Sequence, residues 1–476
     1  MPNKYDVIVV GMGPSSIFCA YELIKLKKYN KVLLIDQGKR VEDRCCPIEK
    51  TKKCIHCKPM CNITNGFSGA GAFSDGKLSL YNSEDDDIHV GGNLHKIIGV
   101  PETKNLIDYA DKIYLDFGAD KHLEGTEYKE EIAKINDRAK KEGIRLINIP
   151  IRHLGTEKSH EVYGRLEKYI EDNGVEMMFQ TSVTDLIIDN DHIQGVKIKA
   201  SKDLENEEIE PTEVYADKVV LAVGRKGANW LVDMANKHNI NTETGIVDIG
   251  VRYELPDEVM KDVNKYMYEA KFIGRVGPFR DKVRTFCQNP SGFVSAEVYD
   301  NNLTLVNGHS YKERKSTNTN LAILVSHHFT SPFKRPIEYG RNVAQNLNDL
   351  GAGNIVVQRL GDIYRGKRTW DYELERNTVQ ATLKSAVAGD ITFALGYRTM
   401  VSILEFIRAV DKIVEGFGAP DNLLYAPEIK FYSNKVVIDK NFETNIKGLY
   451  SIGDGGGMTR GLMMASCSGI QMARNL

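Results

Sequence analysis

The hydrophobic pattern at the start of the chain predicts a strand, a glycine turn, a helix and a second strand. Apolar and β-branched residues fill positions 5–10, and the stretch Gly11-Met-Gly13-Pro-Ser-Ser16 follows directly. Apolar residues then recur at helical spacing over 17–26, and a second apolar run, 31–35, ends at Asp36. A strand–helix–strand segment of this length is typical of a βαβ crossover unit.

Downstream of this unit, helical spacing alternates with short runs of alternating apolar and polar residues. A charged stretch at 101–143 has helical spacing, and another helix is expected at 160–173. The runs EMMFQ, TDLIID and IQGVKIKA predict hairpin strands, and the apolar run 218–223 predicts a buried strand ending at Gly224. These elements indicate one sheet-containing domain with a helical insertion.

The pattern changes near residue 250. Runs such as RTFCQ, GFVSAEVY and LTLVNG predict strands, and helical spacing recurs at 331–349 and 400–416. Beyond Pro427 the chain returns to short strand runs, and it ends with a glycine-rich turn and a helix of small residues at 461–473. We therefore expect a second domain inserted into the first.

Composition and charge narrow the classes of protein. The chain has 476 residues, of which 42% are hydrophobic and 27% charged, as is typical of folded globular proteins. With 63 Lys and Arg against 65 Asp and Glu, the net charge of −2 lacks the basic excess of a nucleic-acid-binding protein. No apolar run approaches the roughly 20 residues of a membrane span, and the N-terminus has no signal-peptide pattern. We expect a cytoplasmic protein that binds neither nucleic acid nor membrane.

The stretch Gly11-x-Gly13-x-x-Ser16 is a near match to the dinucleotide-binding fingerprint. The first glycine permits the tight turn, the second lets the backbone approach a pyrophosphate, and the third position normally lets helix and strand pack closely. Ser16 replaces the usual Gly or Ala, and Asp36 follows it by 20 residues, the distance expected for a carboxylate that binds a ribose. The predicted nucleotide site comprises Gly11, Gly13, Pro14, Ser15, Ser16, Asp36 and Gln37.

A second motif near the C-terminus favours FAD over NAD. The run Thr444-Asn-Ile-Lys-Gly-Leu-Tyr-Ser-Ile-Gly453-Asp454 is a strand that ends in Gly-Asp. It resembles the second flavin-binding motif of Rossmann-type flavoproteins, in which the Asp holds the ribityl chain. The strand 219–223 with Gly224 resembles the segment that lies between the two motifs in those proteins. Three motifs in this order indicate an FAD site.

Four longer stretches make the resemblance specific. GFSGAGAFSDGKL, Arg152-His153-Leu-Gly155-Thr156, VDIGVRYELP and GLYSIGDGGG together resemble the uncharacterised FAD-dependent dehydrogenase family. That family looks related to other NAD(P)/FAD-dependent oxidoreductases and to the geranylgeranyl-reductase-like flavoproteins. The resemblance covers residue 5 to about residue 470. It implies an α/β fold, in which a Rossmann-like FAD/NAD(P)-binding domain carries an inserted α+β substrate domain.

The resemblance and the motifs together give domain boundaries and further cofactor-lining positions. We expect the FAD-binding domain at 1–250, with a Cys-rich loop at 44–62 and a helical insertion at 101–145, the substrate domain at 251–420, and a return to the first domain at 421–476. The further residues predicted to line FAD are Gly69, Ala70, Gly71, Ser74, Asp75, Gly76, Lys77, Val183, Ala222, Gly224, Gly453, Asp454, Gly461 and Leu462.

Five of the eight cysteines fall within one short stretch, which raises the question of a metal. The spacing Cys46-x7-Cys54-x2-Cys57-x3-Cys61 supplies four thiols, enough for a [4Fe–4S] cluster or for tetrahedral zinc. A cluster there could relay electrons to FAD. Alternatively, Cys54 and Cys57 form a CxxC pair capable of thiol–disulfide exchange, or the cysteines carry no ligand.

Four residues are candidates for the chemistry. A reductase needs a proton donor near the carbon that is protonated after hydride transfer, and His153, Tyr253 and His309 are suitable side chains. Arg252 could anchor a substrate carboxylate bidentately. A structural role is the alternative for each of them.

These features predict an FAD-dependent oxidoreductase, a reductase or dehydrogenase acting on a small or medium organic substrate, at an activated C=C or C–C bond. No second dinucleotide fingerprint is present in the sequence, so NAD(P)H would dock at the flavin or a protein such as ferredoxin would supply the electrons. The alternatives are a flavin-dependent tRNA-modifying enzyme, a non-catalytic FAD or metal redox sensor, and a thiol–disulfide reductase. The sequence leaves the substrate, the electron donor and the oligomeric state open.

Overall fold

A computed structural model gives the fold. It describes residues 4–47, 57–73, 76–81, 88, 90–224, 226–243, 247–267, 269–298, 303–310, 314–329, 332–333, 335–431 and 435–476. The chain forms two compact units. Unit 1 comprises Met1–Leu123, Pro150–Glu243 and Ser433–Leu476, and unit 2 comprises Glu124–Ile149 and Thr244–Tyr432.

The centre of unit 1 is a parallel sheet. Its strands run in the order β6-β2-β1-β9, and β21 pairs with the far end of β9. The bounds are β1 Lys4–Val10, β2 Val32–Ile35, β6 Glu176–Met178, β9 Thr212–Leu221 and β21 Leu449–Ser451. β2 is buried throughout, and all residues of β1 from Val7 to Val10 are buried too. Continuous apolar runs are what a parallel sheet covered on both faces requires, so the local pattern explains these strands.

The other part of this sheet is an antiparallel meander. β7 Thr181–Asp189 pairs with β8 His192–Ala200, and β8 pairs with the first half of β9. The second half of β9 pairs with β1 instead, in parallel. β9 is thus the strand that joins the meander to the parallel sheet.

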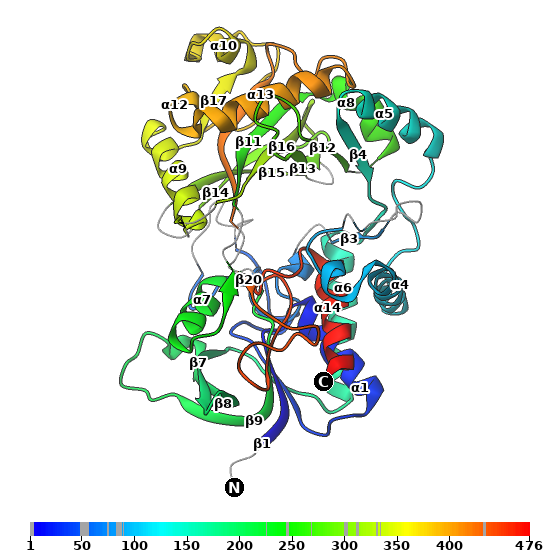
Figure 1. The fold of residues 1–476 in the computed structure, drawn as a ribbon, viewed down its shortest axis with the longest axis vertical. Coiled ribbons are helices and arrows are strands. Elements are labelled where there is room, and N and C mark those ends of the chain that lie inside the picture. Colours follow the sequence, from blue (N-terminus) through cyan, green and yellow to red (C-terminus); the bar gives the residue numbers. More distant parts are fainter. Residues whose placement is uncertain are drawn as a thin grey trace. The chain divides into compact units, whose positions relative to one another are not determined.

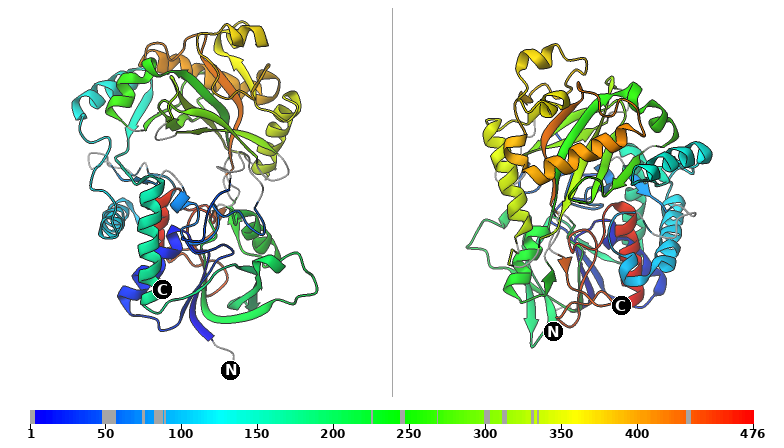
Figure 2. Two further views of the ribbon diagram at one scale, coloured as in Figure 1. Left: turned by 180° about the vertical axis from the view of Figure 1, so that it is seen from behind. Right: turned by 45° about the horizontal axis from the view of Figure 1, so that its top comes forward.

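Helices α1 Pro14–Leu26 and α14 Leu462–Asn475 lie side by side in unit 1, as Figures 1 and 2 show. Their contact is close because Gly469 lacks a side chain: a Cβ there would collide with the carbonyl oxygen of Ser15. The sequence-distant C-terminal helix is thereby held against the helix that follows the fingerprint. The remaining elements of unit 1 are η1 Gly71–Phe73, β3 Lys77–Ser79, α3 His95–Ile98, α4 Val100–Asp116, β5 Ile151–His153, α6 Gly155–Asp172, η2 Ser201–Asp203, α7 Ala228–Lys237, β10 Thr242–Glu243 and β20 Lys435–Val436.

Unit 2 is built on an eight-stranded sheet in the order β18-β17-β19-β11-β16-β13-β12-β4. Neighbouring strands are antiparallel except for β17 and β18. The strand bounds are β4 Ile144–Asn148, β11 Val247–Pro256, β12 Ala270–Gly274, β13 Val283–Asn289, β16 Asn318–His327, β17 Val356–Arg359, β18 Val387–Ala388 and β19 Leu423–Phe431, and a separate hairpin joins β14 Phe293–Val298 to β15 Thr304–His309. The helices are α5 Lys129–Lys141, α8 Asp257–Tyr266, α9 Pro336–Leu350, α10 Leu360–Tyr364, α11 Asp371–Glu375, α12 Thr392–Leu395 and α13 Tyr397–Asp411.

The two faces of β11 differ in chemistry. Alternate residues, among them Val251 and Tyr253, enter the main apolar core of unit 2, to which α13 also contributes Ile403 and Phe406. Figures 1 and 2 show α13 lying across this sheet. Arg252 lies between those two core residues along the strand, and its side chain therefore belongs to the opposite face. It is nevertheless 0% exposed, so this charged side chain is buried.

The fold class is confirmed: unit 1 has a Rossmann-like parallel sheet, and unit 2 is an α+β insertion. The boundaries differ from those we expected. The predicted insertion 101–145 is divided, because α4 stays in unit 1 whereas β4 pairs with β12 and so takes α5 into unit 2. Unit 2 also extends to Tyr432, since β19 pairs with β11 and β17. No helix in the described part of the chain is long and apolar enough to cross a membrane.

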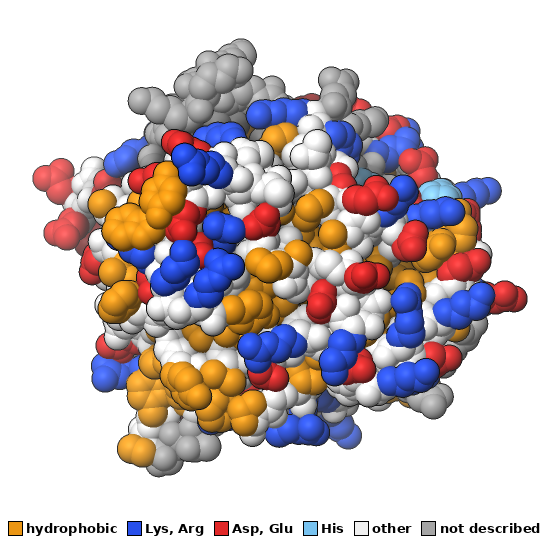
Figure 3. Space-filling view, turned by 90° about the horizontal axis from the view of Figure 1, so that it is seen from above, with side chains coloured by type: hydrophobic (Ala, Val, Ile, Leu, Met, Phe, Trp, Pro, Cys, Tyr) orange, Lys and Arg blue, Asp and Glu red, His pale blue; other side chains and the backbone are white. Residues whose placement is uncertain are grey.

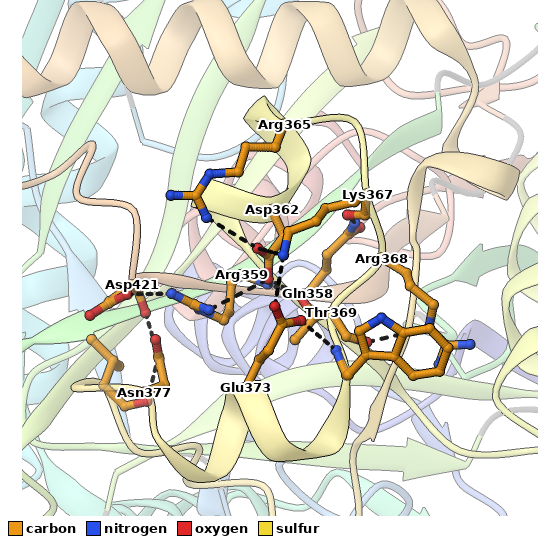
Figure 4. A network of polar contacts seen from close by, with 12 residues as sticks. Gln358, Arg359, Asp362, Arg365, Lys367, Arg368, Thr369, Glu373, Asn377 and Asp421 are labelled. Carbon is orange, nitrogen blue, oxygen red and sulfur yellow. Dashed lines mark hydrogen bonds and ion pairs between the residues drawn. The ribbon is translucent and has the colours of Figure 1, made fainter.

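A buried carboxylate organises one end of unit 2 (Figure 4). Asp362 is 0% exposed and accepts a hydrogen bond from the Thr369 hydroxyl at 2.8 Å. Lys367 and Arg365 lie 3.4 and 3.7 Å from it, with their side chains 43% and 63% exposed. Thr369 in turn accepts the backbone N–H of Arg359 at 2.9 Å. The acid faces inward and Arg365 and Lys367 face outward, whereas Arg359, 3.7 Å from the acid, has a side chain only 17% exposed. The network thus ties a surface loop to the core.

We expect Asp362→Asn to destabilise unit 2 by about 2 kcal/mol. The three cations Arg359, Arg365 and Lys367 lose one carboxylate partner each, while the Thr369 bond is kept. Solvent reaching Arg365 and Lys367 keeps the loss below the about 3–5 kcal/mol typical of fully buried pairs. Thermal unfolding would measure the change. The control is Glu338→Gln, which breaks an exposed ion pair with Arg335 and should change stability by less than about 0.5 kcal/mol. Equal effects of the two substitutions would contradict the prediction.

Candidate cofactor site

The fingerprint turn has the geometry that its sequence predicts. Gly11 has φ of +101°, and a Cβ there would lie 2.5 Å from the carbonyl oxygen of Ala222. Glycine is therefore required at this position by the protein itself. Gly13 caps α1 with φ of −79°, an ordinary extended conformation, and a Cβ there would meet no atom of the described chain within 4 Å. Pro14 begins the helix, and no side chain caps its N-terminus.

Three segments far apart in the sequence converge on this turn. A Cβ at Gly69 would lie 3.4 Å from the Cα of Gly13, so the predicted glycine-rich stretch faces the fingerprint. A Cβ at Gly453 would lie 2.7 Å from the hydroxyl of Ser15. In the same motif, a Cβ at Gly455 would lie 2.5 Å from the carbonyl oxygen of Gly224. The tertiary structure thus brings together all three predicted motifs and the glycine-rich stretch, through contacts that side chains would block.

Asp36 has a role that its spacing did not reveal. Its carboxylate accepts backbone N–H groups from Met12 at 2.9 Å, Gly38 at 2.8 Å and Gly66 at 2.7 Å. Burial raises the pKa of Asp36 above its ordinary value, and these three hydrogen bonds offset part of that rise. Asp36 therefore ties the fingerprint turn to the loop before the glycine-rich stretch.

The distal motif forms a turn in front of α14. Asp454 accepts the Thr459 hydroxyl at 2.8 Å and the backbone N–H of Gly461 at 3.3 Å. Gly461, with φ of +84°, precedes Leu462 at the start of α14, and no side chain caps that helix. The N-termini of α1 and α14 both present backbone N–H groups, the kind of donor that binds phosphate and other anions.

A buried chain of hydroxyl groups connects the glycine-rich stretch to α14. A Cβ at Gly71 would lie 3.0 Å from the ring of Tyr163, whose hydroxyl is 3.0 Å from that of Tyr114. Tyr114 is also 2.9 Å from the hydroxyl of Ser466 on α14. All three side chains are 0% exposed, and burial raises the pKa values of both tyrosines. The chain thus links two segments that are predicted to line the cofactor.

We expect Tyr114→Phe to lower stability by about 1–3 kcal/mol, because it removes the hydroxyl that bonds both Tyr163 and Ser466 and leaves the buried Tyr163 hydroxyl without its partner. Chemical denaturation of the apoprotein would measure this. Tyr215→Phe is the matched control, since that hydroxyl bonds only the exposed Glu213 and its loss should cost little. A stability loss confined to Tyr215→Phe would refute the idea that the hydroxyl chain supports unit 1.

The other predicted cofactor residues lie around the same turns. The Gln37 side chain donates to the Asn65 side chain, and Ser16 is 0% exposed on α1. Ala70 is exposed, whereas Gly76 is buried and accepts the backbone N–H of Leu154. Lys77 is half-buried on β3, and Val183 packs against the core of the main sheet on β7. Ser74 and Asp75 lie outside the described residues.

The cysteine cluster is only partly described. Cys46, Cys57 and Cys61 are half-buried free thiols, and Cys54 lies outside the described residues. Among the residues that the structure describes, no group of three or more His, Cys, Asp or Glu side chains could hold a metal ion. The described part of the loop therefore gives no support for a metal site.

The four candidates for the chemistry are not gathered in one place. His153 lies half-buried on β5 of unit 1, paired with Lys77 of β3. Tyr253 is fully buried in unit 2, where its hydroxyl donates to the carbonyl of Phe417 and accepts from Asn422. Burial raises its pKa well above the ordinary value, which does not suit a proton donor.

Arg252 is also a core residue of unit 2. Its guanidinium donates to the Asn320 side chain at 2.8 Å and to the carbonyl of Cys287 at 2.7 Å, and it lies 3.7 Å from Glu428. Because a Cβ at Gly308 would collide with it, the β14–β15 hairpin covers it. His309, the next residue on that hairpin, is exposed. A substrate cannot reach Arg252 or Tyr253 in this conformation, and only the two histidines remain accessible.

The sequence did not predict a role for Arg44, Tyr114 or Tyr163. Arg44 and Tyr163 contact the glycine-rich stretch or the segment that leads into it, and Tyr114 contacts Tyr163. None stands in a motif. Tyr114 and Tyr163 each lie on an amphipathic helix, where an aromatic residue signals only burial. Arg44 lies in the Cys-rich loop, where the cysteine spacing predicts a metal site and gives no role to the arginine. The local sequence around these three residues therefore does not predict these contacts.

Comparison with known proteins supports the FAD assignment. Residues 247–430 match the family model "FAD-dependent protein, C-terminal domain-like". The match begins at the stretch VDIGVRYELP, one of those that carried the resemblance. An uncharacterised protein of Clostridium beijerinckii is 25% identical over 500 residues, covering 99% of this chain and 81% of that protein.

Solved structures are more distant. A variant of the E. coli quinol fumarate reductase FrdA aligns over 99% of this chain and 69% of its own, at 11% identity and a TM-score of 0.43. Pyridoxine 4-oxidase from Mesorbium loti aligns over 99% of both chains, at 11% identity and a TM-score of 0.42. These similarities are too low to support an inference about this chain.

The match agrees with the resemblance to an FAD-dependent family over residues 247–430. The broad prediction of an FAD-dependent enzyme of the oxidoreductase class agrees with the match. The match carries no information about the substrate, an electron donor or a metal.

Proposed function

We propose that this chain, whose residues 247–430 match an FAD-dependent protein family, is an oxidoreductase that binds FAD in unit 1. The observation that carries the proposal is Gly13. Its backbone angles suit any residue, and no atom of the described residues lies where its side chain would stand. The protein itself has no need of glycine there, whereas a pyrophosphate approaching the backbone does.

The residues around the fingerprint turn of unit 1 are of the chemical types that bind FAD. The N-terminus of α1 and Gly13, which has no side chain, would face the pyrophosphate. Asp36 retains one of its about four lone-pair sites beyond its three backbone hydrogen bonds, and this site could accept a ribose hydroxyl. Asp454 would receive the ribityl hydroxyls, and the start of α14 would add backbone N–H donors. FAD supplies the hydride or electron chemistry when bound, and the protein orients it.

For the reaction we keep the prediction of an activated C=C or C–C bond in a small or medium organic substrate, reduced or dehydrogenated. His153 is the candidate proton donor that we favour. It lies in unit 1, half-buried, in register with Lys77 of a predicted cofactor-lining stretch. NAD(P)H or reduced ferredoxin would supply electrons to the flavin.

The charge pattern does not favour the alternative of a tRNA-modifying enzyme. On the face shown in Figure 3, the described Lys and Arg side chains are interspersed with Asp and Glu, and they form no continuous basic stripe there. An enzyme that binds tRNA would neutralise several phosphates along one track. This face of the described residues gives that alternative no support.

The test is anaerobic purification followed by a visible absorption spectrum, identification of the released flavin, and iron and zinc assays on the same sample. FAD at about one per chain, reduced by NADH, NADPH or reduced ferredoxin, would support the proposal. Loss of proton transfer in His153→Gln, with flavin reduction retained, would support its role. Absence of flavin binding by the apoprotein would refute the proposal. Iron or zinc in the sample would instead support the hypothesis that the Cys-rich loop, including Cys54, binds a metal.

A further inference from the structure

Arg44 stands at the start of the Cys-rich loop and is only 3% exposed. Its Nε donates to the carbonyl of Asn62 at 2.7 Å. Its Nη1 donates to the carbonyl of Phe67 and to the hydroxyl of Ser68, the latter at 3.0 Å, and its Nη2 donates to the carbonyl of Gly69. One side chain thus holds the segment that leads into the glycine-rich stretch.

Within the described residues, this guanidinium is in ion-pair contact with no carboxylate. Its hydrogen-bond acceptors are three backbone carbonyls and one hydroxyl, and no described carboxylate lies in ion-pair contact with it. Other arginines of unit 1 behave differently: Arg40 contacts Glu167 at 3.0 Å and Glu171 at 2.6 Å, and Arg152 contacts Asp111 at 2.7 Å. Burial lowers the pKa of Arg44 to about 10, which still leaves it positively charged at neutral pH. A buried cation without a carboxylate in direct contact is costly, and an anion that approaches it lowers this cost.

The positive charge of Arg44 lies next to the glycine-rich stretch of the candidate cofactor site. Gly69, whose carbonyl accepts from Arg44, is the residue that faces Gly13 of the fingerprint. The guanidinium also stacks over the ring of Phe73 at 4.7 Å, and this contact fixes its position. Asp36 is the carboxylate whose charge acts on it most strongly, and that carboxylate is itself occupied by three backbone N–H groups.

Arg44 also sets the orientation of one peptide group. Because a trans peptide places its C=O and N–H on opposite sides, turning the carbonyl of Gly69 toward Arg44 turns the N–H of Ala70 away from it. Ala70 is exposed, and its N–H donates no hydrogen bond within the described residues. Backbone N–H groups that are oriented outward in this way are the donors from which anion-binding sites are built.

We propose that Arg44 provides the positive charge for the pyrophosphate of FAD and presents the Ala70 amide to it, acting as a positioning residue behind the glycine-rich stretch. The inference rests on the proposed FAD site. Arg44 also holds the described residues 62–69 in place through its hydrogen bonds.

The experiment separates charge from shape with three variants. Arg44→Gln removes the charge and keeps a hydrogen-bond donor, and Arg44→Lys keeps the charge and loses the planar fork. Arg40→Gln is the matched control, because Arg40 is in the same loop but its charge is met by two glutamates. FAD titration of each apoprotein gives Kd, and competition by ADP and by adenosine separates the pyrophosphate from the nucleoside.

We expect Arg44→Gln to raise the Kd for FAD about 10-fold or more and to lower the preference for ADP over adenosine by a similar factor, as loss of a charged hydrogen-bonding group predicts. Arg44→Lys should keep most of the ADP preference, and Arg40→Gln should resemble the wild type. Damage to the fold alone would weaken ADP and adenosine equally, which would overturn the proposal. So would an unchanged ADP preference in Arg44→Gln.

Two further outcomes remain distinguishable. If Arg44→Gln does not fold, as judged by circular dichroism, the Arg44→Lys variant decides: a lost ADP preference with the charge still present would overturn the proposal. If the wild-type apoprotein binds neither FAD nor ADP, the proposed function fails, and the variants are not needed to show it.

Discussion

The substitution Gly13→Ala should leave the apoprotein folded and weaken FAD binding about 10- to 100-fold. The structure tolerates the new methyl group, since no described protein atom lies within 4 Å of it and the backbone has φ of −79°. Alanine caps a helix less well than glycine, a cost of about 1 kcal/mol or less. In the complex, the methyl group would intrude where the pyrophosphate meets the backbone. An intrusion of that size typically costs about 1–3 kcal/mol, and each 1.4 kcal/mol is a factor of ten in Kd.

Gly11→Ala is the contrasting control. There the methyl group would lie 2.5 Å from the carbonyl oxygen of Ala222, at φ of +101°, so the apoprotein itself should be destabilised. Thermal unfolding of both apoproteins, together with FAD titration, distinguishes a fold effect from a ligand effect. Normal FAD affinity in Gly13→Ala would remove the main support for the site.

The second large effect is expected from Asp36→Ala. Three backbone N–H groups, those of Met12, Gly38 and Gly66, lose their acceptor together. Each buried donor left without a partner costs about 1–3 kcal/mol, so we expect unit 1 to lose about 3 kcal/mol or more. FAD affinity should fall in parallel, because the fingerprint turn and the loop before the glycine-rich stretch are no longer joined. Hydrogen exchange at these three amides should accelerate far more than in the β8–β9 meander.

Asp36→Asn refines this prediction. The amide keeps one oxygen, so at least one of the three N–H donors then faces an NH₂ group, and the stability loss should lie between those of wild type and Asp36→Ala. If Asp36 served only to bind a ribose, neither variant would change the exchange rates of the apoprotein. That result would contradict the structural role assigned to the carboxylate.

Much of unit 1 could be predicted from the sequence because its signals are local. The apolar run 5–10, the turn Gly11-Met-Gly13-Pro-Ser-Ser16 and the helix after it were found with boundaries within a few residues of β1 and α1. Strand period, helical period and the need for positive φ at Gly11 are all properties of neighbouring residues. The family resemblance extended this to FAD, and the match over 247–430 to an FAD-dependent protein family agrees with it.

Predictions for single polar side chains were less successful. Arg252 and Tyr253 were chosen for their chemistry, but the structure buries both in unit 2 and satisfies the Tyr253 hydroxyl internally. The helical insertion was assigned to one domain, but long-range pairing of β4 with β12 divides it between two units. Each error concerns partners that come from distant parts of the chain, about which a local pattern carries no information.

The sequence by itself determined which residues turn, which form strands and helices, and which motif families they resemble, because those properties depend on backbone sterics and on periodicity over a few residues. Only the tertiary structure decided that Gly13, Gly69 and Gly453 meet in one place, that Asp36 accepts three backbone amides, and that Arg44 is a buried cation with no described carboxylate in ion-pair contact. The physical reason is that a buried polar group must find its partners through packing. Those partners come from segments that are adjacent in space and far apart along the chain.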